Sequence, residues 1–264
     1  RSPDAPRTGT PADLLVVGLG NPGEEYARTR HNVGADVVEL LGQRHGARLR
    51  KGKERALVDE VRIGGARVAL AVPITYMNDS GDAVRRLVHR YGVTPDRLVV
   101  VHDELDLPLA ALRVKAGGGL AGHNGLRSIK SHLHDDAFLR IRIGIGKPTS
   151  RQQGADHVLD RFSKRDRVEI DVTVERAADA GEQAHHSRDE DAVTGYLHER
   201  VRPQHTTKAQ VHVGEQGLVG VRLAGAQHVA KERLAEGVVS LVVLVAGAEA
   251  HALHAAAHLV AVLG

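Results

Sequence analysis

The sequence predicts an α/β fold: a three-layer α/β/α single domain around a mixed, twisted β-sheet, with an unassigned C-terminal extension. Two fully apolar segments, Leu14–Val17 and Leu98–Val101, are typical of strands buried on both faces of a sheet. Amphipathic segments with helical spacing alternate with the strands, and two further strands joined at Gly64 and Gly65 form a hairpin. This alternation favours helices on both faces of one sheet.

The individual elements follow from hydrophobic periodicity and from the glycines at their ends. The expected strands span residues 14–17, 56–63, 66–72, 98–101, 112–115 and 138–145. The expected helices span residues 32–45, 79–91, 122–134 and 164–180. Gly46 and Gly92 follow the first two helices, where a left-handed residue ends a helix at little cost.

Composition divides the chain into three parts. Residues 1–12 are polar with three prolines and are expected to form a disordered leader. Residues 13–180 form the predicted domain, and residues 181–264 are the unassigned extension. The extension contains 9 of the 17 histidines and a single aromatic residue, Tyr196. We expect it to be poorly ordered or non-native, and a change of reading frame in the coding gene is one hypothesis for its composition.

Charge and cysteine content narrow the function classes. Residues 1–180 contain 29 Lys and Arg against 24 Asp and Glu, a net charge of +5 that suits a polyanionic partner. The absence of cysteine excludes disulfides and thiolate chemistry and fits a reducing, cytoplasmic compartment. The longest apolar stretch, Val238–Ala246, is too short for a membrane span, which takes about 20 residues.

Two glycine-rich segments follow predicted strands. Residues 18–23 match the dinucleotide-binding pattern GxGxxG, but that site needs a helix that opens within the glycines, and Pro22 and Gly23 make a turn instead. Asn21 is better interpreted as a side chain presented at the end of the sheet. Residues 117–126 contain enough glycine to approach a ligand closely or to capture phosphate at a helix start, with a flexible loop as the alternative for the first glycines.

Polar side chains gather where the strands end, which is where open α/β sheets bind ligands. His31 can act as a general base or be an ordinary surface histidine. Asn78 can direct its amide at a carbonyl or water, or serve as a turn and cap residue. Asp103 can accept a proton from a histidine nitrogen and fix its tautomer, or bind a metal if ligands cluster. Glu104 and Asp106 are expected to be exposed to solvent.

Six short motifs follow one another between residues 18 and 146. They are GLGNPG at 18–23, YARTRHNVG at 26–34, PITYMNDSG at 73–81, HDELDLP at 102–108, GHNGL at 122–126 and RIGIG at 142–146. In this order and spacing they resemble the bacterial-type peptidyl-tRNA hydrolase family. The resemblance implies a monomeric cytoplasmic enzyme that acts on peptidyl-tRNA and returns tRNA to translation, with no metal, no cofactor and no membrane association.

The resemblance also implies roles for individual residues. His31 would deprotonate the attacking water, Asp103 would orient His31, and Asn21 would be the third catalytic residue. The substrate- and tRNA-binding residues that it implies are Tyr26, Tyr76, Met77, Asn78, His123, Asn124, Lys115 and Arg142. Attack of water on an ester requires such a base, with donors for the developing oxyanion. A non-catalytic RNA-binding relative and a nucleotide-binding enzyme stay as alternatives.

Overall fold

The computed structural model describes residues 11–148, 154–184, 193, 195, 210–213, 218–222 and 230–233. The chain divides into two compact units, residues 1–197 and 198–264. Most of the predicted leader and most of the predicted extension lie outside the described residues. Ala12, at the end of the predicted leader, is buried and donates its backbone N–H to the carbonyl of Tyr91 at 2.9 Å. Within the described ranges, no helix is long and apolar enough to cross a membrane.

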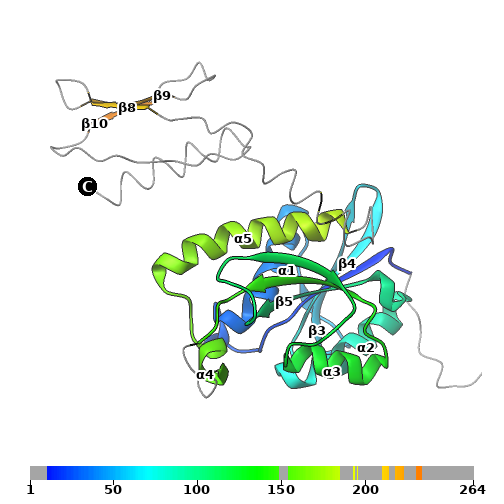
Figure 1. Ribbon diagram of the computed structural model, residues 1–264. Helices are drawn as coiled ribbons and strands as arrows, with labels where there is room; N and C mark the ends of the chain where they lie inside the picture. The colour runs from blue at the N-terminus through cyan, green and yellow to red at the C-terminus, as the bar shows by residue number, and fades with distance from the viewer. Residues whose placement is uncertain are drawn as a thin grey trace, which may run out of the picture. The chain divides into compact units, whose positions relative to one another are not determined.

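A mixed seven-stranded sheet forms the centre of the first unit (Figure 1). The strand order is β2-β3-β4-β1-β5-β7-β6. The four central strands β4, β1, β5 and β7 are parallel, and β2, β3 and β6 run antiparallel to their neighbours at the edges. The strands are β1 (Leu14–Gly18), β2 (Arg50–Lys51), β3 (Ala56–Ile63), β4 (Ala66–Pro73), β5 (Leu98–Glu104), β6 (Leu112–Ala116) and β7 (Leu139–Gly144).

Helices cover both faces of this sheet, as Figure 1 shows. They are α1 (Val33–Arg44), α2 (Ser80–Tyr91), α3 (Asn124–Leu133), α4 (Gly154–Leu159) and α5 (Lys164–Gln183). α1 and α5 pack on one face, where Leu14 and Val16 of β1 belong to their core cluster. α2 and α3 pack on the other face, where Leu15 and Val17 join a second cluster. Because β1 buries both of its faces, its sequence is apolar throughout, and the predicted three-layer α/β fold is confirmed.

β5 continues further than its apolar run predicted. It ends at Glu104 rather than Val101, because its last residues pair in parallel with β7, with Asp103 opposite Ile143. Asp103 and Glu104 therefore lie on the strand itself, at the carboxyl edge of the sheet.

The predicted helices are present with small shifts at their ends. α2 ends at Gly92, whose φ of 59° is left-handed as expected, while Asp79 occupies the N-cap position without a capping side-chain hydrogen bond. α3 begins at Asn124, two residues later than expected, because the His123 side chain caps it. α5 continues to Gln183, three residues past its predicted end. Four short 3-10 helices lie in the connections between strands and helices: η1 (Glu24–Tyr26), η2 (Arg30–Asn32), η3 (Met77–Asp79) and η4 (Pro95–Arg97).

The second unit contains an antiparallel three-stranded sheet of its own. Its order is β10-β9-β8, formed by β8 (Gln210–Val213), β9 (Leu218–Arg222) and β10 (Ala230–Arg233).

Candidate active site

Close backbone packing fixes the position of His31. The residue lies in η2, which leads directly into α1. A Cβ atom added at Gly34, in the first turn of α1, would lie 2.2 Å from the carbonyl oxygen of Val101 in β5. Only glycine permits this approach, so the start of α1 rests directly on the end of β5. His31 is thereby brought to the same edge of the sheet as Asp103.

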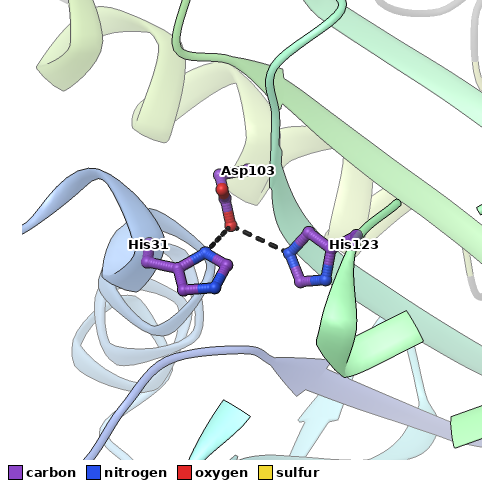
Figure 2. A group of neighbouring side chains, drawn as sticks. All are labelled: His31, Asp103 and His123. Carbon is purple, nitrogen blue, oxygen red and sulfur yellow. Dashed lines mark hydrogen bonds and ion pairs between the residues drawn. The ribbon is translucent and has the colours of Figure 1, made fainter. Parts of the chain in front are cut away.

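Three side chains meet at this edge, as Figure 2 shows. His31 Nδ1 lies 2.8 Å from Asp103 Oδ1, and His123 Nε2 lies 3.0 Å from the same oxygen. His31 comes from η2, Asp103 from β5 and His123 from the N-cap of α3. The structure thus joins three of the residues singled out from the sequence around one carboxylate oxygen.

The electrostatics of this cluster favour an ionised carboxylate. Burial alone would raise the pKa of the Asp103 carboxyl, but its electrostatic interactions with the His31 and His123 rings and the hydrogen bonds from both hold that pKa well below its ordinary range. Burial disfavours the charged form of His31. The charge of Asp103 and the hydrogen bond outweigh that effect, so the pKa of His31 is raised above its ordinary value of 6.5.

His102 supports the cluster from inside the sheet. Its ring is fully buried and packs edge-on against the ring of His123, with centroids 4.9 Å apart. Its Nδ1 lies 2.6 Å from the backbone carbonyl of Asp103. Burial lowers the pKa of His102 to about 3, so this ring is neutral. It therefore adds no positive charge beside Asp103.

A reciprocal pair of hydrogen bonds holds Asn21. The Asn21 backbone N–H donates to Asn32 Oδ1, and Asn32 Nδ2 donates to the Asn21 carbonyl, both at 2.9 Å. The Asn21 side-chain oxygen accepts from the backbone N–H of Met77 at 2.8 Å. Since the acceptor end of the Asn21 amide is occupied, its NH₂ group is the end left to bind another molecule.

Glycine packing links Met77 to the histidine cluster. A Cβ atom added at Gly125, in the first turn of α3, would lie 2.6 Å from Met77 Sδ and 3.1 Å from His123 Cε1. Met77 is buried, so it forms part of the wall beside the cluster. Tyr26 and Tyr76 form a second pair, edge to face with ring centroids 6.4 Å apart, and Tyr76 is exposed.

The other two predicted asparagines lie on the surface. Asn78 lies in η3 and Asn124 in the first turn of α3, and both are exposed. Asn124 Oδ1 accepts a long 3.4 Å hydrogen bond from Arg127. No hydrogen bond among the described residues joins Asn78 or Asn124 to Asn21 or to the histidine cluster.

Glu104 is buried, so the expectation that it would be solvent-exposed is wrong. Its Oε2 accepts two hydrogen bonds from the Arg142 guanidinium, one from Nε at 3.1 Å and one from a terminal nitrogen of the same group at 3.0 Å. The parallel pairing of β5 with β7 extends to Glu104 and explains this burial. Asp106, in contrast, is exposed as expected. Lys115, in the edge strand β6, is half-buried, and its ammonium group lies near Gly118.

Sequence reasoning missed Asn32, which locks the glycine turn to η2. The residue was interpreted only as the start of a helix, and its buried side chain instead makes both hydrogen bonds to the Asn21 backbone. Its position directly after His31 was the available signal. The bond from His123 to Asp103 was also missed, because it depends on how α3 packs beside the end of β5 and no local pattern records that packing.

The three clustered side chains also match the residue types of a metal site. The nearest ligand atoms of His31, Asp103 and His123 all lie within 4.8 Å of one another. However, His123 Nδ1 accepts hydrogen bonds from the backbone N–H groups of Gly125 and Leu126, which leaves the ring proton on Nε2. A metal would need a lone pair on that nitrogen. These three side chains are therefore better described as two N–H groups donating to one carboxylate than as ligands of a metal ion.

Comparisons with known proteins agree on one family. The family model described as peptidyl-tRNA hydrolase matches residues 15–204. A peptidyl-tRNA hydrolase from Frankia alni is 49% identical over 178 residues, which cover 66% of this chain and 90% of the relative. One from Nocardia farcinica is 53% identical over 169 residues, or 64% of this chain and 88% of the relative.

Solved structures support the same relationship. The crystal structure of peptidyl-tRNA hydrolase from Acinetobacter baumannii aligns with a TM-score of 0.64 at 36% identity, over 72% of this chain and 94% of that chain. The match to the family model covers well over half of the chain and extends past residue 180. The chain therefore belongs to the peptidyl-tRNA hydrolase family.

Proposed function

We propose that this chain hydrolyses the ester bond between peptide and tRNA in peptidyl-tRNA and releases free tRNA for reuse in translation. The relatives carry this activity in their names. The observation that carries the proposal is the 2.8 Å contact between His31 Nδ1 and the buried carboxylate of Asp103. We propose that the chain acts as a cytoplasmic monomer that needs no cofactor.

His31 is the proposed general base. Asp103 is ionised and accepts the Nδ1 proton, so the lone pair of His31 is on Nε2. No hydrogen bond to Nε2 is present among the described residues, and the side chain keeps 10% of its surface exposed. Water can therefore reach Nε2, which takes its proton as the water oxygen attacks the ester carbonyl carbon.

The tetrahedral intermediate then collapses. The carbon–oxygen bond to the terminal ribose breaks, and the leaving ribose oxygen takes the proton back from the His31 imidazolium. The products are a peptide with a free carboxylate and a tRNA with a free hydroxyl. Asp103 stabilises the imidazolium in between, which fits the raised pKa of His31.

Asn21 is the best-supported donor for the oxyanion. Its side-chain oxygen is anchored to Met77, so its NH₂ group is preorganised for a developing negative charge. Asn78 and Asn124 are exposed and are proposed to bind substrate around this point.

Tyr26, Tyr76 and Met77 are proposed to line the binding site for the peptide and the terminal nucleotide. The resemblance places His123 with them, but its burial and its contact with Asp103 favour a supporting role. The pair of tyrosine rings presents an aromatic surface that a base or an apolar side chain can contact. Lys115 and Arg142 are the proposed contacts to tRNA phosphates. Lys115 is the stronger of the two, because Arg142 already pairs with Glu104.

The test is release of peptide from peptidyl-tRNA by the wild type and by His31→Ala. We expect turnover to fall by roughly 10²–10⁴-fold, the usual contribution of a positioned base, with near-normal tRNA binding. His89→Ala is the matched control, because His89 is an exposed histidine of α2 outside the site. Equal rates in wild type and His31→Ala would remove His31 from the mechanism. RNA binding without any turnover by the wild type would favour a non-catalytic RNA-binding relative.

A further inference from the structure

His123 bridges the first turn of a helix and the carboxylate of Asp103. It occupies the N-cap of α3, and its Nδ1 accepts from the backbone N–H groups of Gly125 at 3.1 Å and Leu126 at 3.4 Å. On the other side of the ring, Nε2 lies 3.0 Å from Asp103 Oδ1. A cap of this kind is unusual, since caps are ordinarily Ser, Thr, Asp or Asn.

These two contacts fix the tautomer of His123. A neutral imidazole has one N–H and one lone pair. The lone pair is on Nδ1, because that nitrogen faces two backbone donors. The proton is therefore on Nε2, and His123 donates to Asp103.

The tautomer of His123 bears on His31. Asp103 Oδ1 is the acceptor for both rings, so His31 also donates, through Nδ1. This leaves Nε2 of His31 as the basic nitrogen. Figure 2 shows the two rings directed at the one oxygen from opposite sides.

Burial favours a supporting role for His123 over broad contact with substrate. Its side chain is only 6% exposed, and the ring packs edge-on against the buried His102. Gly125 allows the ring to lie close to the first turn of α3, since a Cβ there would lie 3.1 Å from His123 Cε1. The ring therefore has little freedom to change its donor and acceptor directions.

We propose that His123 is a positioning residue, which ties Asp103 to the first turn of α3 and so holds the carboxylate where it fixes the tautomer and orientation of His31. This rests on the proposed function, in which His31 is the base. It goes further by giving the N-cap of α3 a part in the protonation pattern of the site. His123 contacts Asp103 and acts on the substrate only through it.

A substitution by asparagine separates the two contacts. Asparagine is among the favoured N-cap residues, so His123→Asn retains the cap of α3. Its shorter side chain cannot also reach Asp103, so the donor to the carboxylate is lost. His132→Asn is the matched control: it makes the same chemical change on the same helix, and His132 contacts the Ser128 carbonyl instead.

For His123→Asn we expect kcat to fall by about ten-fold while KM stays within about two-fold, the scale of losing a partner that orients a reacting group. Loss of one N–H donor leaves more negative charge on Asp103 to stabilise the His31 imidazolium. The acidic limb of the pH profile of kcat/KM therefore moves to higher pH. His132→Asn should leave kcat, KM and the pH limb unchanged.

The outcomes separate this inference from the proposed function. If the wild type turns over peptidyl-tRNA and His31→Ala does not, the proposed function stands whatever His123→Asn does. If His123→Asn has the wild-type kcat and the acidic limb of its kcat/KM profile does not move, His123 serves only as a helix cap. A rise in KM alone would make it a substrate contact. Either result overturns the inference.

A measurement on the unmodified protein does not depend on activity. Imidazole ¹⁵N NMR of the full wild-type chain at neutral pH should show His123 protonated on Nε2 and His31 protonated on Nδ1 when neutral. A His123 ring protonated on Nδ1, alone or as an imidazolium, would contradict the inference, because Nδ1 could then not accept from α3.

Discussion

Asp103 determines how the protons of the neighbouring rings are distributed. Its carboxylate is buried in the last part of β5, and its Oδ1 accepts from both His31 and His123. A buried ionised carboxylate is costly unless hydrogen bonds and opposite charge compensate it. Here both rings supply N–H donors, and the same bonds leave His31 Nε2 available to a water molecule. The compensation of the buried charge and the proposed catalytic geometry therefore depend on the same contacts.

The first prediction concerns Asp103→Asn. The amide keeps the shape of the side chain but removes the charge, and its NH₂ group can turn towards His31 and favour the wrong tautomer. We expect kcat to fall by roughly a thousand-fold. Loss of a general base and a base held in the wrong tautomer both have effects of about this size. The pH profile of kcat/KM measures the second consequence.

The direction of the pH change follows from the charge. Asp103 raises the pKa of His31, so its neutralisation lowers that pKa. The base works only when neutral and is lost as pH falls through its pKa. The residual activity of Asp103→Asn should therefore persist to lower pH than that of the wild type. A limb that stays in place or moves to higher pH would contradict the role given to this charge.

At the residue scale, the motifs predicted that His31 and Asp103 would meet, but not every contact of the candidate site. The pairing of His31 with Asp103 came from the resemblance to the family's motifs, and the structure brings the two side chains together. Glu104 was misplaced, since burial of a carboxylate depends on Arg142, 38 residues away on the next strand. Long-range partners of this kind leave no local pattern.

Among the secondary-structure elements, the packing of α1 against the sheet positions His31, the proposed base. A Cβ at Gly18, the last residue of β1, would lie 2.2 Å from the Gly34 carbonyl, and one at Gly34 would lie 2.2 Å from the Val101 carbonyl. β1, β5 and the first turn of α1 therefore meet with no side chain between them. His31 lies three residues before Gly34, so any displacement of α1 is transmitted to the base.

The second prediction compares two glycines of α1. Gly34→Ala should lower the free energy of unfolding by about 2 kcal/mol through overpacking. It should also lower kcat by at least about ten-fold, because misplacing a reacting group by about 1 Å is costly. Gly42→Ala is the control. Its Cβ would meet only ordinary contacts, the nearest at 3.5 Å, so it should be neutral or stabilise by up to about 1 kcal/mol.

Urea unfolding of the two variants measures the change in stability, and their steady-state turnover measures the change in kcat. A Gly34→Ala enzyme with wild-type kcat would show that α1 can move without displacing His31. A Gly42→Ala variant as damaged as Gly34→Ala would mean that α1 tolerates no added methyl group anywhere, and that the contact with Val101 has no special part.

The boundaries of elements were predictable where a local signal ends them. Gly92 stops α2 as expected, because glycine adopts the left-handed conformation readily. The end of β5 was not predictable from its own residues, since it is set by pairing with β7. The two-residue strand β2 has exposed side chains and no hydrophobic pattern, so only its pairing with β3 defines it.

For the whole molecule, the site and the core belong to the first unit. Every residue of the candidate site and of the two core clusters lies between Ala12 and Val193. The family model matches residues 15–204 and so contains nearly all of them. Net charge does not distinguish the two units, because residues 1–197 hold 30 Lys and Arg against 28 Asp and Glu, and residues 198–264 hold 6 against 5. The net +5 belongs to residues 1–180, which contain the whole candidate site, so attraction of the tRNA polyanion is expected there.

The last prediction is that a chain ending after Gln204 keeps its activity. It retains the whole family match, and it loses a segment with four Lys and Arg against four Asp and Glu, whose net charge of zero gives no attraction for phosphate. We expect kcat and KM for peptidyl-tRNA within about two-fold of the full chain, a difference of about 0.4 kcal/mol, and an unchanged Tm. Steady-state kinetics and thermal unfolding of both chains measure this. A ten-fold rise in KM would give residues 205–264 a part in binding tRNA, and a lower Tm would make them part of the cooperative fold.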